Sequence, residues 1–243
     1  KDLNTNFPFI PCTKGCTADF AIAHTLEWRE KYKPWLVTPS TLVENEKGWM
    51  YVRGYSPTPH HTDDSVGGNG LVWYRPGLHK MENSEAYLRV IMHNLDVCSA
   101  KALQRSGGKI GKCNVILDSS GFGLSMIPPM SVAKRFIIMM QDHFPDRLGV
   151  LVIANLGGAA QVLLKLIMPL VPEAVRYKIH VLPNDRKSQI DMLGHLVNHA
   201  YIPDWLGGND TFRFDANIYY NTDMTFGSDA EGTAYLETMP YHA

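Results

Sequence analysis

Residues 112–121, KCNVILDSSG, and residues 143–155, HFPDRLGVLVIAN, decide the fold of this chain of 243 residues. Each contains a short apolar run that stops at a polar residue, Asp118 in the first and Asn155 in the second. Such runs are typical of strands buried in a sheet. An Ile- and Met-rich helix is expected between them, over residues 131–143, so the two strands should pair in parallel.

The same alternation extends in both directions along the chain. Helical patterns are expected from a cap at Thr17 or Asp19 to Tyr32, and over residues 83–103, 159–169 and 188–199. Strands are expected over residues 48–55, 71–74 and 178–182, with a polar loop over residues 57–70. After Gly208 the sequence has no convincing period and is expected to form an extended tail. The pattern predicts an α/β fold with a mixed, largely parallel sheet.

Composition excludes several classes of protein. The formal net charge is −1, so the chain lacks the basic field that nucleic-acid binding requires. The densest apolar stretch, residues 159–171, is too short and too interrupted to span a bilayer. No signal-peptide pattern opens the sequence, so a cytoplasmic location with access to membrane surfaces is expected. The four cysteines are expected to be reduced thiols, the alternative being a link or a metal at Cys12 and Cys16.

Several segments, taken in order, resemble the CRAL-TRIO family of lipid-binding domains. A strand ends in Asp-x-x-Gly, a turn resembles the family's "Per" turn, and the next strand ends in Asn. A "kKi"-like strand and a closing "lPeelGG"-like segment follow. These are residues 115–121, 143–149, 152–155, 177–179 and 202–208, and residues 25–29 are similar to the last helix of the preceding helical module.

The resemblance implies helices flooring the sheet and a deep apolar pocket closed by a mobile gate helix. It implies three parts: residues 1–45 as the remnant of an N-terminal helical module, residues 46–209 as the lipid-binding domain, and residues 210–243 as a C-terminal extension packed on it.

The helix expected after Asn155 is the candidate gate. Its apolar residues fall at helical spacing along one stripe, at Ala159, Val162, Leu163, Leu166, Ile167 and Leu170. Gly157-Gly158 just before it is a candidate hinge. The alternative is that this segment is an ordinary core helix.

For the head group, the resemblance implies an acid in the "Per" turn and a lysine in the "kKi" strand. The matching residues are Asp146 and Lys178. Asp146 could accept hydrogen bonds from inositol hydroxyls, and Lys178 could bind phosphate. Alternatively, Asp146 is a cap or pairs with Arg147, and Lys178 is a solvated lysine. Cys113 and Val115 stand where phosphatidylcholine-binding members have hydroxyls, which favours a more apolar pocket.

The sequence therefore favours a non-enzymatic protein that binds one phospholipid or neutral lipid and transfers or presents it at membranes. No cofactor other than the lipid is expected. The alternative is a regulatory module of the same fold that recruits a protein or membrane and exchanges little lipid.

Other groups of residues support weaker hypotheses about metal binding or catalysis. His195 and His199 have the spacing of helical metal ligands but no third ligand, and His60-His61 lies beside two aspartates in a loop. A metal or haem at these histidines stays open. Ser119 and Ser120 follow a strand as a nucleophile would, but without the G-x-S-x-G pattern of hydrolases.

Overall fold

A five-stranded sheet forms the centre of the molecule, in the order β1-β2-β3-β4-β5. The computed structural model describes residues 17–57 and 68–221. β1 pairs antiparallel with β2, and every other pair of neighbouring strands is parallel. The strands are β1 (Met50–Tyr55), β2 (Gly70–Tyr74), β3 (Cys113–Asp118), β4 (Leu148–Ala154) and β5 (Ile179–Val181). The mixed, largely parallel sheet expected from the sequence is confirmed.

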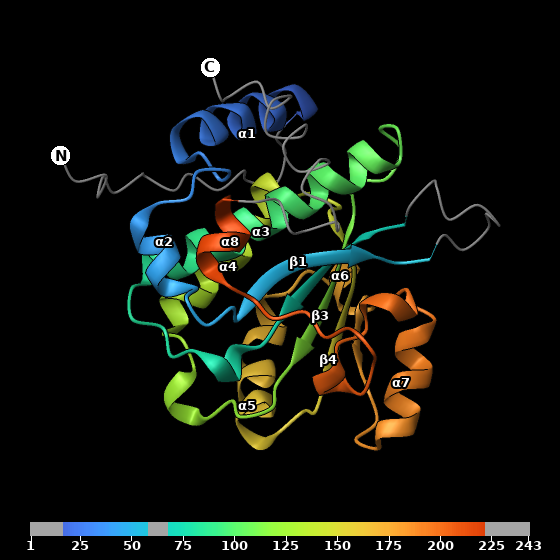
Figure 1. The fold of residues 1–243 in the computed structure, drawn as a ribbon. Coiled ribbons are helices and arrows are strands. Elements are labelled where there is room, and N and C mark those ends of the chain that lie inside the picture. The colour runs from blue at the N-terminus through green and yellow to red at the C-terminus, as the bar shows by residue number, and fades with distance from the viewer. Residues whose placement is uncertain (1–16, 58–67, 222–243) are drawn as a thin grey trace.

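Helices cover both faces of this sheet (Figure 1). They are α1 (Ala18–Tyr32), α2 (Pro39–Glu44), α3 (Ser84–Arg105), α4 (Met130–His143), α5 (Gly158–Ile167), α6 (Glu173–Arg176), α7 (Arg186–Gly194) and α8 (Ala216–Asn221). A short 3-10 turn, η4 (Met168–Leu170), continues α5. The expected caps of α1 and α3 are confirmed, since the side chains of Thr17 and Asn83 accept from backbone N–H groups of the first turn. In the described part of the chain, no helix is long and apolar enough to cross a membrane.

Two sequence-based expectations about the C-terminal third are wrong. α7 ends at Gly194 rather than running to residue 199, because the chain folds back so closely that the His199 imidazole would lie 2.7 Å from a Cβ at Gly194. His195 and His199 therefore do not share one helix. The segment after Gly208 is not wholly extended either. Asp215 accepts a hydrogen bond from the backbone N of Ile218 and opens α8.

The two faces of the sheet bury two separate apolar clusters, because successive side chains of a strand point in opposite directions. On one face, Val52, Val72 and Cys113 pack against α3 and α4. On the other, residues such as Trp73 and Ile116 pack against α7 and the C-terminal segment. Figure 1 shows α7 on the side of the sheet opposite α5.

The N-terminal helix is held against α4 and α3 by specific contacts. The Trp28 ring stacks on His143 with centroids 4.2 Å apart. Arg29 forms an ion pair with Asp96 of α3 at 2.5 Å. Burial lowers the pKa of His143 to about 4, so its ring is neutral and stacks as an uncharged aromatic at neutral pH.

A buried hydroxyl is one of the contacts that join the C-terminal segment to the core. Tyr219 Oη accepts from the backbone N of Val52 in β1 at 2.7 Å and donates to Asn94 Oδ1 in α3 at 2.9 Å. Tyr219 itself is 7 % exposed. This hydroxyl therefore satisfies polar groups of two elements that have no water available.

Replacing Tyr219 by Phe should lower the free energy of unfolding by about 1–3 kcal/mol, because a backbone donor and an amide acceptor lose their partner in a buried site. Urea denaturation with an unchanged m-value measures the loss. Tyr177→Phe is the matched control, since Tyr177 is 69 % exposed. Equal stability of the two variants would show that the Tyr219 hydroxyl does not anchor the segment.

Candidate functional site

A partly enclosed cavity of about 490 Å³ lies between the sheet and the helices α3, α4 and α5. This size is in the range of pockets that bury most of one small ligand. Its walls are predominantly apolar, and few polar side chains line it. Lining side chains from the helices include Leu88, Ile91 and Leu95 of α3, Val132, Phe136 and Met140 of α4, and Ala160, Leu163, Leu164 and Ile167 of α5.

β3 and β4 form the centre of the cavity floor. Cys113, Val115 and Leu117 line the cavity, while Ile116 is fully buried in the cluster on the other face. The period-2 alternation of a strand produces this division. The structure thus places both strand residues singled out from the sequence, Cys113 and Val115, on the cavity floor, and neither offers a hydroxyl.

Two tyrosine hydroxyls in the wall satisfy each other. Tyr74 and Tyr87 line the cavity, and their hydroxyl oxygens lie 2.7 Å apart. Burial raises the pKa of both groups, so both are neutral at physiological pH. The pair adds a hydrogen bond to the wall without adding charge, and this part of the cavity suits an apolar ligand.

α5 divides its apolar residues between the cavity and solvent. Leu163 and Ile167 of the expected stripe line the cavity. Val162 and Leu166 instead are 44 % and 48 % exposed, and Ala159 and Leu170 are not among the lining residues. The expected stripe is therefore divided, because part of the broad apolar surface of α5 lines the cavity and part faces outward.

A charged cluster lies at one end of the cavity. Asp146 accepts from Lys178 Nζ at 3.2 Å and pairs with Lys112 Nζ at 3.0 Å. Lys178 also donates to the backbone oxygen of Leu148 at 2.8 Å, which holds its side chain at the wall. Asp146, Arg147 and Lys178 line the cavity. The two head-group residues expected from the sequence are thus brought together.

Lys112 is the member that sequence reasoning missed. It directly precedes β3, Asp146 precedes β4 by two residues, and Lys178 directly precedes β5. Since β3, β4 and β5 are parallel neighbours, the residues before each strand meet at the same edge of the sheet. The order of strands and the position of Lys112 in the sequence could have predicted this contact.

The electrostatics of the cluster centre on Asp146. The Lys112 ammonium, and after it Lys178, hold the pKa of the Asp146 carboxyl below its usual value. The residue has a left-handed backbone, with φ of 54°, which Asp adopts more readily than most residues. That conformation turns the carboxylate back between the two lysines.

A polar network fixes the chain at the other end of β4, just before α5. Asn155, with φ of 53°, donates from Nδ2 to Asp118 Oδ1 at 2.8 Å and accepts from Gln189 Nε2 at 3.1 Å. Ser119 Oγ donates to the backbone oxygen of Asn155 at 2.5 Å. These bonds connect the base of α5 to the end of β3 and to α7.

Gly157 and Gly158, which follow shortly after Asn155, have open space around them. A Cβ added at Gly157 or Gly158 would meet no atom within 4 Å. None of the α5 residues is fully buried. The hinge expected at these glycines stays a prediction, and a fixed Asn155 followed by unpacked glycines is compatible with it.

The weaker hypotheses find no support in the described part of the chain. No three His, Cys, Asp or Glu side chains there group as metal ligands. Ser119 Oγ donates to backbone oxygens and Ser120 Oγ donates to Asp118, so both hydroxyls serve the network around Asn155. The His60-His61 loop and the Cys12 and Cys16 positions lie outside the described residues.

Replacing Lys112 by Gln should raise the pKa of Asp146 toward its ordinary value, because a neutral amide no longer stabilises the carboxylate. NMR titration of the Asp146 carboxyl carbon measures this pKa. Lys178→Gln should raise the pKa of Asp146 less than Lys112→Gln does. Lys109→Gln, at an exposed lysine in the preceding turn, is the control. An unchanged pKa in Lys112→Gln would remove Lys112 from the cluster.

Comparison with known proteins agrees with this architecture. The chain is 24 % identical over 219 residues to "Phosphatidylinositol transfer protein PDR17" of Saccharomyces cerevisiae, covering 79 % of this chain and 58 % of that protein. It is 29 % identical over 124 residues to "Sec14 cytosolic factor" of Schizosaccharomyces pombe, covering 51 % and 41 %. The chain thus spans only about half the length of these relatives.

The crystal structure of Sfh5 has the same fold, with a TM-score of 0.57 and 14 % identity over 90 % of this chain and 76 % of that one. The model of the CRAL/TRIO domain matches residues 57–208, more than half of the sequence. With its largely parallel sheet, its apolar cavity and this match, the chain belongs to the CRAL/TRIO domain family.

Proposed function

We propose that this chain binds one hydrophobic lipid in the cavity and transfers or presents it at membranes. The observation that carries the proposal is the partly enclosed, mainly apolar cavity between the sheet and α5, with charged groups confined to one end. An amphiphile has the same division, with one polar end and a long apolar remainder.

The energetics of such a cavity suit exchange with a bilayer. Burying a methylene gains about 0.8 kcal/mol in the cavity and in the bilayer alike. A lipid therefore gains nearly the same free energy on leaving water for either of them. The free-energy difference between cavity and bilayer is then small, and a lipid can move in both directions. The flexible side chain of Met140 in the wall can adapt to chains of different shape.

The charged cluster supports a phosphate-bearing ligand as one option. Lys178 is 14 % exposed and lies at the cavity wall, where it can form a charge-assisted hydrogen bond to phosphate. Such a ligand would compete with Asp146 for the lysine, while Lys112 keeps Asp146 paired. A neutral lipid would leave this ion-pair cluster intact. Both phosphoinositides and neutral lipids therefore remain within the proposal.

The name of one relative, a phosphatidylinositol transfer protein, supports lipid transfer, and the name of another, a cytosolic factor, supports a cytoplasmic location. The outward apolar residues of α5, Val162 and Leu166, support transient contact with a membrane. We accordingly propose a cytoplasmic protein, peripheral at membranes, that acts as a carrier rather than as an enzyme.

Native mass spectrometry of the purified chain, followed by lipid extraction, tests the proposal directly. One co-purifying lipid per chain supports the carrier, and its head group identifies the ligand class. No bound lipid after incubation with mixed liposomes would overturn it and favour the second candidate, a module of this fold that recruits a protein partner. The exposed apolar side chains of α1, Ile22 and Leu26, favour that candidate if the cavity proves empty.

Lys178→Ala should lower phosphatidylinositol transfer between vesicles by about tenfold, since a charge-assisted hydrogen bond contributes about 1.5–3 kcal/mol. The transfer of a neutral lipid should change little. Lys187→Ala, at an exposed lysine of α7, serves as the control. Equal phosphatidylinositol transfer by both variants would exclude Lys178 from head-group binding.

The double variant Gly157→Ala/Gly158→Ala should slow lipid exchange several-fold without changing the equilibrium affinity, because alanine restricts the hinge but clashes with nothing. Release of a fluorescent lipid to acceptor vesicles measures the rate. Gly123→Ala, which also meets no neighbour, is the matched control outside α5. An unaltered exchange rate in the double variant would argue against α5 as the gate.

A further inference from the structure

A second hollow lies beside the cavity, along α5, η4 and α6. Leu164, Lys165, Met168, Pro169 and Arg176 line this side hollow, which measures about 600 Å³ and is open to solvent. Leu164 also lines the partly enclosed cavity. The side hollow and the cavity therefore meet at one side chain.

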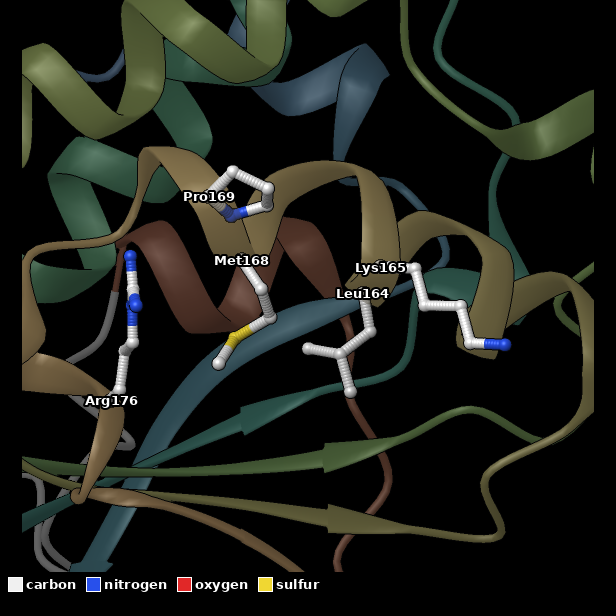
Figure 2. A pocket seen from close by; sticks show the side chains of 5 residues that line it. All are labelled: Leu164, Lys165, Met168, Pro169 and Arg176. Atoms are coloured by element: carbon white, nitrogen blue, oxygen red, sulfur yellow. The ribbon is translucent and has the colours of Figure 1, made fainter.

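The side hollow has an apolar centre with a cation on each side. Figure 2 shows Leu164 and Met168 projecting from α5 and η4 toward the strands. Lys165 and Arg176 stand on opposite sides of them in the same view. A ligand that fits this arrangement carries an apolar chain and a negative group.

Both cations are available to such a group. Arg176 Nε donates to the backbone oxygen of Val171 at 3.0 Å, which fixes the guanidinium at the end of α6. Within residues 17–57 and 68–221, neither Arg176 nor Lys165 forms an ion pair with a carboxylate. Lys178, in contrast, is already paired with Asp146. The side hollow thus offers two cations that pair with no carboxylate of the described residues, whereas Asp146 offsets part of the positive charge at the cavity end.

We propose that the side hollow is a lateral entrance to the cavity for single-chain anionic amphiphiles. The carboxylate or phosphate of the ligand binds between Lys165 and Arg176, and its chain passes Met168 and Leu164 into the cavity. A single chain is specified because the two spaces share one lining side chain, Leu164, and a second acyl chain would need a wider opening. This inference rests on the proposed lipid binding and names a ligand class for it.

Met168 provides the sharpest steric test, because it lines the side hollow but not the cavity. Met168→Trp should slow the uptake of cis-parinaric acid, followed by stopped-flow fluorescence, roughly tenfold, since passage then requires displacing an overpacked ring. Leu164→Ala should accelerate uptake. Val162→Trp is the matched control on the outward face of α5, where residue 162 is 44 % exposed.

Equal uptake rates in Met168→Trp, Leu164→Ala and the control would overturn the lateral entrance. Because the Leu164 change removes bulk while the Met168 change adds it, opposite shifts in rate also separate passage from general damage to the fold.

A charge test uses the same chain with and without its negative group. The double variant Lys165→Gln/Arg176→Gln should weaken binding of cis-parinaric acid about fivefold, the effect of losing two exposed ionic contacts. Binding of the methyl ester should be unchanged. Lys134→Gln/Lys187→Gln removes two exposed charges elsewhere and is the control. Equal losses for acid and ester would overturn the anion site.

The outcomes also separate this inference from the proposed function. If neither probe binds the wild-type chain, although another lipid co-purifies with it, the single-chain assignment fails and lipid binding stands. If no lipid of any kind binds, both fail. Displacement of the bound probe by oleate or by lysophosphatidate then identifies whether the site prefers a carboxylate or a phosphate.

Discussion

Parallel pairing of β3, β4 and β5 is the constraint on which the other features depend. It places the three strand beginnings at one edge of the sheet, where Lys112, Asp146 and Lys178 meet, and the strand ends at the other edge, where Asn155 is fixed. Each connection must also return across the sheet before the next strand starts. α4 and α5 make those returns, and the space beneath them is the cavity.

Stability is distributed unevenly around that cavity. α3 supplies a wall with many fully buried residues, among them Leu88 and Met92, whereas no residue of α5 is fully buried. Elements with few buried contacts open at lower free energy than those in the core. The wall that the proposed exchange requires to move is therefore the weakly packed one, and the polar network at Asn155 holds its point of attachment.

The strands and most helices could be predicted from the sequence because apolar runs and their polar ends are local signals. The choice of Asp146 and Lys178 as head-group residues followed from the resemblance, whereas their contact with each other follows from the parallel register. The end of α7 at Gly194 and the outward turn of Val162 and Leu166 could not be predicted in the same way. They depend on close approach of His199 and on where the cavity lies around α5, which are properties of tertiary packing.

The two left-handed residues, Asp146 and Asn155, lie just beyond the two ends of β4 and so define the span of the cavity floor. A strand of seven residues covers about 23 Å at ~3.3 Å per residue. One leaflet of a bilayer has a hydrocarbon thickness of about 15 Å, half of the full core. The floor is thus longer than the hydrocarbon of one leaflet, so the lipid chain of the proposed ligand could lie extended along β4 without folding back, with about 8 Å left for its head group.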